Sequence, residues 1–513
     1  MSDGASRPGR VHLLSKFCGV GVRETQSFTG TSNVPSAHPS RAATAAVSPG
    51  PKPGVGGKRE QESLQERHGL SRQTALIFGL LLVLFCAART LSEPPLPKFD
   101  DHVEAYVSNR DFTGSVLIGK SGHVVFQKSY GMANYEWSIP NTDKTKFHIA
   151  SVTKTFTAAA IVILEQQGKL TLNDPLSKYF PNYLNGDRIT IEQMLAHSSG
   201  LPDYYSLPEY PTKKYQRVTL ADLIEWVKTK PLDFLPGSKN SYSNTGYGFL
   251  AYIIEQVTGK PYDQFITEEI LRPAGMKDTG TLRDEALIPA RADGYQPALG
   301  SPGLRNAPFY DKTILTGSGS LYSTAGDLYA WCRAIEANRF FDIRKLAYPY
   351  GWGARETKSK HKYIEQSGRD PGFASHIAVF LDDDLVVIVL GNLEDAAVNV
   401  MADDLAALAL GENPRSPAAR AKTTAPVPHT GDYAGRYEVN PTFLIDVRAE
   451  GSDLYLRGTG GDYLPLEPLA KDSFFYRQLY VKVGFQRDKE GKIETLLWNG
   501  DYPCKKVSVK PQP

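Results

Sequence analysis

The sequence predicts two structured parts of different class: a mixed α+β part over residues 95–411 and a small all-β barrel or sandwich over residues 431–513. The first prediction depends on hairpin patterns near both ends of that part, with helical segments between them. The second depends on short strand-like segments, separated by turns, with no helical stretch. Residues 412–430 are rich in Pro, Ala, Arg and Thr, and we expect them to form a linker.

The expected elements of the first part follow from apolar periodicity and from the Gly, Pro and Asn residues between segments. In chain order they are a helix over 99–109, a hairpin of strands 114–120 and 123–130, a helix over 151–167, helices over 189–196, 220–229, 249–257 and 326–337, a second hairpin within 376–391, and a helix over 396–410.

The strands expected in the second part are short and rich in aromatic and β-branched residues. They begin at Tyr437, Phe443, Asp453, Phe474, Tyr480 and Ile493. Glu450-Gly-Ser and Asp488-Lys-Glu-Gly are expected turns between them. The sequence contains no repeat of fixed period.

Composition limits the classes of function. A net charge of +2 gives no reason to expect nucleic acid or an acidic macromolecule as a partner. The cysteines and histidines show neither metal-ligand spacing nor a disulfide framework, so we expect no metal and no other cofactor. Gly317-Ser-Gly319 lacks the third glycine and the preceding strand of a dinucleotide site, and a tight turn is expected there.

Residues 1–70 are rich in Ser, Gly, Pro, Arg and Thr and have no apolar periodicity, which predicts a disordered extension. An apolar run over residues 75–88 follows Arg72 and ends on the small residues Cys86-Ala-Ala. This run is short for a bilayer-spanning helix but typical of the core of a signal peptide. We therefore expect segment 71–92 to be a signal peptide, with an uncleaved membrane anchor as the alternative.

A signal peptide implies export to the periplasm or the extracellular space, with contact to a membrane only through residues 75–88 if they are not cleaved. Signal peptides normally begin at the N-terminus. We therefore hypothesise that translation starts near Leu70 and that residues 1–70 are an artefact of start-site assignment.

Ser151 and Lys154 lie at the N-terminal edge of the helix expected over residues 151–167. Residues i and i+3 are neighbours on a helix surface, so the hydroxyl and the amine would point the same way. A serine is a weak nucleophile unless a neighbouring base takes its proton, and a desolvated lysine can do so. A Ser-x-x-Lys tetrapeptide also arises by chance in a chain of this length, so its context has to decide.

That context is a series of motifs in a fixed order. Ile149-Ala-Ser-Val-Thr-Lys154 is followed by His197-Ser-Ser-Gly-Leu-Pro202, Tyr242-Ser-Asn244 and Gly368-Arg-Asp-Pro-Gly372-Phe. Together they resemble the serine β-lactamase and penicillin-binding-protein superfamily, in the branch of class C β-lactamases, DD-carboxypeptidases, D-aminopeptidases and related esterases. The C-terminal strands resemble the lipocalin-like β domain often appended to this family.

The resemblance implies an antiparallel sheet flanked by helices plus a helical subdomain. It also implies a catalytic set in which Ser151 is acylated, Lys154 helps take its proton and Tyr242 acts as a base or proton relay. Tyr242 suits that role only if Lys154 lowers its pKa. Asn244 would bond Lys154 or a substrate amide, and the backbone N–H groups of Ser151 and Arg369 would form the oxyanion hole.

The third motif departs from the family pattern, in which Lys-Thr-Gly or His-x-Gly places a cation beside the substrate carboxylate. Here Gln366-Ser367-Gly368 stands in that place, with Arg369 next to it. We expect all four to contact substrate, and Arg369 is a candidate for the missing cation or a solvated charge at the strand end. The uncharged Gln366 favours an esterase or peptidase over a carboxypeptidase or β-lactamase. His197, at a helix end before a Gly-Leu-Pro turn, is expected to be structural.

The sequence therefore predicts an exported serine hydrolase, and we expect its substrates to be small molecules or peptides, cell-wall peptides among them. We expect a monomer. D-Ala-D-Ala carboxypeptidase and class C-type β-lactamase activity are alternatives within that class. A catalytically silent protein that binds peptidoglycan or peptides is the alternative of another class, although a binding protein would not need the full set of Ser151, Lys154, Tyr242 and Asn244.

Overall fold

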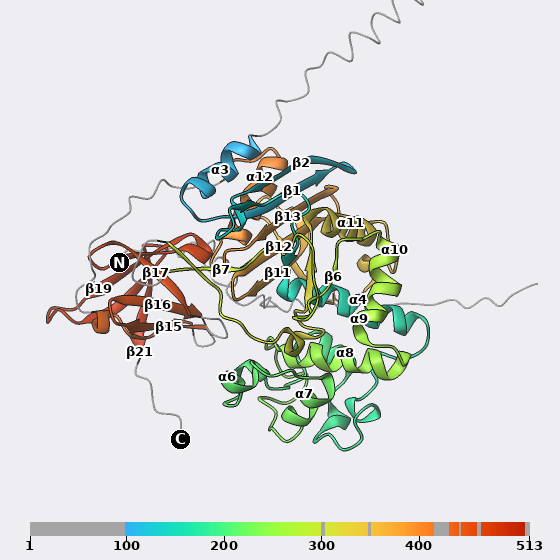
Figure 1. The fold of residues 1–513 in the computed structure, drawn as a ribbon. Helices are drawn as coiled ribbons and strands as arrows, with labels where there is room; N and C mark the ends of the chain where they lie inside the picture. The colour runs from blue at the N-terminus through green and yellow to red at the C-terminus, as the bar shows by residue number, and fades with distance from the viewer. Residues whose placement is uncertain are drawn as a thin grey trace, which may run out of the picture. The chain divides into compact units, whose positions relative to one another are not determined.

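The structure is a computed structural model that describes residues 98–298, 303–346, 350–414, 430–440, 443–458 and 463–507 (Figure 1). The expectations for residues 1–70, for segment 71–92 and for most of the linker therefore lie outside the described residues. Within the described residues, no helix combines the length and the apolar character that a membrane crossing requires.

The first part is built on a six-stranded antiparallel sheet in the order β10-β11-β12-β13-β1-β2. The outer hairpins pair strands that are close in sequence, whereas β1 pairs with β13 across most of the chain. Both expected hairpins are present. The strands are β1 (Gly114–Lys120), β2 (His123–Tyr130), β10 (Gly353–Glu356), β11 (Lys362–Asp370), β12 (Phe373–Phe380) and β13 (Leu385–Gly391).

Helices cover both faces of this sheet, so its central strands read as continuous apolar runs. In β13, Ile388 packs into the core shared with α4 (Thr153–Gln166) and α11 (Ala325–Glu336). Its neighbour Val387 points to the other face, into the core shared with α3 (Phe99–Ser108) and α12 (Val398–Ala409). Alternation of side chains along a strand explains how one strand supplies both cores.

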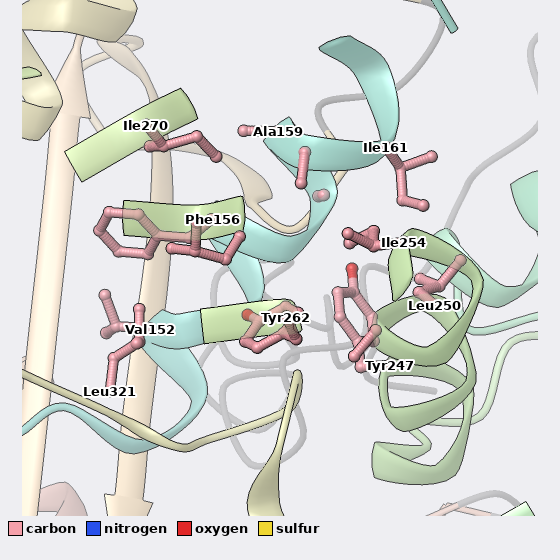
Figure 2. Close-up of a cluster of buried hydrophobic side chains, with 14 of the residues drawn as sticks. Val152, Phe156, Ala159, Ile161, Tyr247, Leu250, Ile254, Tyr262, Ile270 and Leu321 are labelled. Atoms are coloured by element: carbon pink, nitrogen blue, oxygen red, sulfur yellow. The ribbon is translucent and has the colours of Figure 1, made fainter. Parts of the chain in front are cut away.

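A helical subdomain is formed by the segments between α4 and α11. Its elements include α5 (Ile191–Leu195), α6 (Tyr210–Lys213), α7 (Leu220–Val227), α8 (Asn244–Thr258), α9 (Tyr262–Ile266) and α10 (Arg272–Ala274). Figure 2 shows Phe156 and Ile161 of α4 beside side chains of α8 and α9, among them Tyr247, Ile254 and Tyr262. This packing fixes the first turns of α4 and α8 relative to each other.

The helix expected over 249–257 begins earlier in the structure, at Asn244, because Ser243 caps it by accepting a hydrogen bond from the Gly246 N–H. The turns before residue 249 contain two glycines, which weakened the helical signal in the sequence.

The second part is a closed antiparallel barrel in which eight strands follow one another in chain order. They are β14 (Gly435–Asn440), β15 (Phe443–Glu450), β16 (Asp453–Gly458), β17 (Leu464–Ala470), β18 (Ser473–Tyr476), β19 (Val481–Arg487), β20 (Ile493–Trp498) and β21 (Tyr502–Val507). The expected all-β class is confirmed, with two additional strands. β17 and β21 contain prolines, which conceal a strand pattern.

Candidate active site

Ser151 lies in a single 3₁₀ turn, η3 (Ala150–Val152), directly before α4. Ala150 has a φ of 44°, in the left-handed region that residues with a Cβ rarely adopt. Such strained backbone is common where a side chain must be held in one place. The turn and the first helical turn together place the Lys154 Nζ 3.0 Å from the Ser151 Oγ, as the i, i+3 spacing predicts.

The amine of Lys154 has three neighbours that can accept a hydrogen bond. Besides Ser151, these are the Asn244 Oδ1 at 2.8 Å and the backbone carbonyl of Ser318 at 2.7 Å. Of the three, only the Ser151 hydroxyl can also donate. When Lys154 is neutral, its two N–H bonds therefore satisfy Asn244 and Ser318, and its lone pair faces the Ser151 hydroxyl.

Burial favours this neutral form. The Lys154 side chain is completely buried, and desolvation lowers its pKa to about 7, even though the half-buried carboxylate of Asp203 acts in the opposite direction. Lys154 also lies 4.8 Å from the centre of the Tyr242 ring and 5.5 Å from that of Tyr247. A lysine with a pKa near neutrality can accept a proton at physiological pH.

The phenol of Tyr242 donates a hydrogen bond of 2.7 Å to the Ser151 Oγ. Burial raises the pKa of Tyr242 above its usual value, and the charge of Asp203 raises it further. The shift is opposite to the lowering by Lys154 that the sequence led us to expect. Desolvation of the phenolate is the dominant effect here, so Tyr242 keeps its proton at neutral pH and Lys154 is the group of the pair that is available to accept one.

Asn244, the first residue of α8, joins Lys154 to a carboxylate. Its Oδ1 accepts from Lys154, and its Nδ2 donates to the Asp203 Oδ2 at 3.0 Å. Asp203 is also held by the backbone N–H groups of Asn244 and Tyr205. Burial raises the pKa of Asp203, an effect that these hydrogen bonds partly offset.

His197 has a structural role: it contacts Tyr242 and Ser243 rather than Ser151. Its Nδ1 accepts a hydrogen bond of 3.2 Å from the Ser243 N–H, and its ring lies 4.6 Å from the ring of Tyr242. Burial lowers the pKa of His197 to about 3, with a smaller effect from Lys154, so the ring is neutral. The imidazole thus supports the Tyr242-Ser243-Asn244 segment.

Strand β11 lies against the serine turn. A Cβ placed on Gly368 would come within 2.2 Å of the Ile149 carbonyl oxygen and 3.0 Å of the Ser151 backbone nitrogen. Only glycine allows this approach. β10 pairs with β11 only up to Glu365, so among the described residues no strand pairs with that edge of β11 from Gln366 to Asp370.

The four β11 residues expected to contact substrate divide between the two faces of the sheet. Gln366 points toward the α4 side, where its Nε2 donates to the Gly351 carbonyl at 3.0 Å. Ser367 and Arg369 point to the opposite face: the Ser367 Oγ bonds His376 and Asn399, and the Arg369 Nη2 donates to the Ala396 carbonyl. The structure therefore does not bring the Arg369 guanidinium to Ser151, although its backbone lies one residue from Gly368.

Asp203 and Ser318 are two parts of the site that were not expected from the sequence. Asp203 directly follows the His197-to-Pro202 motif, which was a usable signal. Ser318 contributes a backbone carbonyl, which has no side-chain signature, from the tight turn expected at Gly317-Ser-Gly. Within the described residues, no group of three His, Cys, Asp or Glu side chains could hold a metal ion.

Comparison with known families agrees with this geometry. The family described as Beta-lactamase matches residues 99–412. The chain belongs to the Beta-lactamase family. This family consists of serine hydrolases and acyl-transferases related to penicillin-binding proteins. A second family, described as a domain of unknown function (DUF3471), matches residues 419–511, which include the barrel.

Individual similar proteins show how far the similarity extends. Penicillin-binding protein 4* of Bacillus subtilis is 27% identical over 440 residues, covering 79% of this chain and 97% of that protein. The solved structure of a penicillin-binding protein from Bacillus halodurans is 26% identical, with a TM-score of 0.53, and covers 60% of this chain and 99% of that one. A D-amino acid amidase from Ochrobactrum anthropi is 25% identical, with a TM-score of 0.51, over 57% of this chain and 90% of that one.

Proposed function

We propose that this protein is a serine hydrolase that cleaves ester or amide bonds through an acyl-enzyme on Ser151. The observation that carries the proposal is the pair of contacts on the Ser151 Oγ: Lys154 at 3.0 Å, with a pKa of about 7, and Tyr242 at 2.7 Å. A nucleophile within hydrogen-bond reach of a base of near-neutral pKa fits acyl transfer.

In the proposed acylation step, the Ser151 Oγ forms a bond to the carbonyl carbon of the substrate while its proton moves to the Lys154 Nζ. Tyr242, which has kept its proton until then, donates it to the leaving oxygen or nitrogen as the bond to that atom breaks. Once the leaving group has left, the proton on Lys154 passes to Tyr242 and restores the phenol. Deacylation by water runs through the same groups in reverse.

The carbonyl oxygen of the substrate becomes negatively charged in this step and needs donors. We propose the backbone N–H groups of Ser151 and Arg369 for that role, since Gly368 brings β11 against the serine turn. The role needs no particular side chain at position 369, which fits an arginine whose guanidinium bonds the other face of the sheet.

The substrate class follows from relatives and from Gln366. Penicillin-binding proteins and a D-amino acid amidase are among the similar proteins, which makes β-lactams, D-Ala-D-Ala peptides and D-amino-acid amides candidates beside simple esters. Gln366 supplies no charge, and its amide is engaged by Gly351, which favours an esterase or peptidase.

A hydrolysis panel tests the proposal: nitrocefin, short-chain p-nitrophenyl esters, D-amino-acid amides and D-Ala-D-Ala peptides, each with wild type and with Ser151→Ala. We expect turnover of esters or amides by wild type and a loss of about 10³-fold or more in kcat for the variant. Equal rates for the two proteins would contradict it. Absence of any turnover would favour the catalytically silent binding protein instead.

We further propose, from residues 71–92 alone, that the enzyme is exported. N-terminal sequencing of the protein from its native host tests this: a mature chain that begins shortly after Ala88 is expected. A chain that retains the residues before 71 would contradict it.

A further inference from the structure

The side chain of Arg369 leads away from the candidate active site. Its backbone N–H is the second oxyanion donor proposed above, whereas its guanidinium lies on the opposite face of the sheet, where the Nη2 donates to the Ala396 carbonyl at 3.2 Å. Ala396 belongs to residues 392–397, which connect β13 to α12 and which we call the β13–α12 segment. Arg369 therefore ties the end of β11 to this segment.

The turn that follows Arg369 is tied to the same segment. The N–H of Gly372, between β11 and β12, donates to the Glu394 Oε2 at 3.0 Å. Of the strands that the structure describes, none pairs with the outer edge of β11 beyond Glu365. The end of β11 is therefore supported by its pairing with β12 and by these two contacts with the β13–α12 segment.

Asp395 lies between Glu394 and Ala396 and joins the β13–α12 segment to the barrel. Its carboxylate is 2% exposed and lies 3.0 Å from the Nη1 of Arg477. Burial raises the pKa of Asp395, and the charges of Arg477 and, to a smaller extent, Arg369 act in the opposite direction. Two guanidinium groups therefore act on this one carboxylate, one from the barrel and one from β11.

Arg477 uses its whole guanidinium for such contacts. It is the first residue of η11 (Arg477–Leu479), a 3₁₀ turn between β18 and β19. Its Nε lies 3.1 Å from Asp111, its Nη1 contacts Asp395, and its Nη2 contacts Glu467 of β17. Each nitrogen has a different carboxylate as its partner, a geometry that suits the rigid, planar fork of an arginine.

Contacts beside Arg477 hold η11 against the first helix of the Beta-lactamase part. The Asn109 Nδ2, directly after α3, donates to the Tyr480 hydroxyl at 3.0 Å. The Tyr480 ring also lies 5.0 Å from the ring of Tyr106 in α3. The position of Arg477 is thus fixed by its own ion pairs and by the residue that follows η11.

We propose that Arg477 is a positioning residue for the hydrolysis: through Asp395 and Arg369, it holds the Arg369 backbone N–H at the place where the oxyanion forms. The inference rests on the proposed hydrolase function and on the oxyanion role proposed for Arg369. Without Arg477, Asp395 would attract Arg369 more strongly and draw the end of β11 away from the serine turn. A shift of about 1 Å at a reacting centre lowers the rate by about 10²-fold.

The test pairs the best substrate of the hydrolysis panel, ester or amide, with its thionoester or thioamide, in which sulfur replaces the carbonyl oxygen. Oxyanion donors stabilise a charge on oxygen at a defined place, so the ratio of kcat/KM for the two substrates reports the geometry of these donors. The ratio does not depend on the fraction of protein that is folded. We expect wild type to prefer the oxygen substrate, and Arg477→Met to reduce that preference by about 10-fold, through kcat rather than KM.

Arg369→Met tests the route, because it keeps the backbone N–H and does not alter the ion pairs of Arg477. It should reduce the preference as Arg477→Met does. The double variant should lose little more than either single variant, since both changes break the same connection. Arg448→Met, at an exposed arginine of the barrel, is the matched control and should leave the preference unchanged.

An unchanged preference in Arg477→Met would overturn the inference, as would losses that add up in the double variant. A wild-type protein without a preference for oxygen would overturn it as well. Failure of the hydrolase function is distinct, because it would appear as turnover that survives Ser151→Ala.

Discussion

At the scale of single residues, the proposed mechanism makes the reactivity of Ser151 depend on the protonation state of Lys154. Lys154 donates to Ser151 when charged and can accept the serine proton only when neutral. Its pKa of about 7 results from burial that removes water from the ammonium group, opposed by the carboxylate of Asp203. Asp203 thereby tunes a base that it does not touch, since Asn244 lies between them.

This arrangement predicts the pH dependence of the reaction. The neutral fraction of Lys154 grows as pH rises through its pKa, so kcat/KM for a neutral ester should increase with pH and level off above about 7. Asp203 raises the pKa of Lys154, so Asp203→Asn should lower that pKa and move the rising limb to lower pH. Stopped-time assays from pH 5 to 9 measure both profiles.

Asp187→Asn is the control: it removes an exposed carboxylate from the same helical subdomain and should leave the rising limb of the pH profile at the same pH as in wild type. A limb at the same pH in Asp203→Asn and in wild type would show that a group other than Lys154 controls the profile.

At the scale of elements, the site is made where β11, the serine turn η3 and the start of α8 meet. The closest approach is that of Gly368 to Ile149 and Ser151. A methyl group at Gly368 would overlap the Ile149 carbonyl, so Gly368→Ala must push β11 and η3 apart. A displacement of about 1 Å in a reacting centre costs about 10²-fold in rate.

We therefore expect Gly368→Ala to lower the rate of Ser151 acylation by about 10²-fold, with a loss of about 1–3 kcal/mol in the free energy of unfolding. Burst kinetics and urea unfolding measure the two effects. Gly353→Ala in β10 is the matched control, because a Cβ there meets its neighbours at 3.6 Å or more. Equal acylation rates in the two variants would refute the close approach of β11 to the serine turn.

Much of the way in which these elements place the site residues could be predicted from the sequence. Two sequence features predicted that four side chains lie in one site. They are the i, i+3 spacing of Ser151 and Lys154 and the Tyr242-Ser-Asn244 motif before a helix. The contribution of Ser318 could not be predicted, since it is a backbone carbonyl. The direction of the Tyr242 pKa shift depends on burial, which sequence spacing does not reveal.

At the scale of the whole molecule, ion pairs join residues of the barrel to residues of the Beta-lactamase part. Arg477 of the barrel lies 3.1 Å from Asp111 and 3.0 Å from Asp395. Asp111 is completely buried and Asp395 is 2% exposed. Because the Arg477 guanidinium lies beside two buried carboxylates, we expect the barrel to contribute to the stability of the Beta-lactamase part.

Arg477→Met should lower the free energy of unfolding by about 3–5 kcal/mol, because it removes a guanidinium that pairs with two buried carboxylates. Thermal or urea unfolding measures it. Arg448→Met, which breaks an exposed barrel pair with Glu450, should cost about 1 kcal/mol or less. Similar losses in the two variants would mean that the Arg477 pairs do not form in solution.

Covalent labelling tests most directly whether Ser151 is the acylated residue. Purified protein is treated with a fluorophosphonate or a fluorescent penicillin and examined by intact mass spectrometry and peptide mapping. We expect a single adduct on Ser151 of wild type, formed faster above pH 7 than below it, and none on Ser151→Ala. An adduct on another residue, or equal labelling of wild type and Ser151→Ala, would contradict the mechanism proposed for this site.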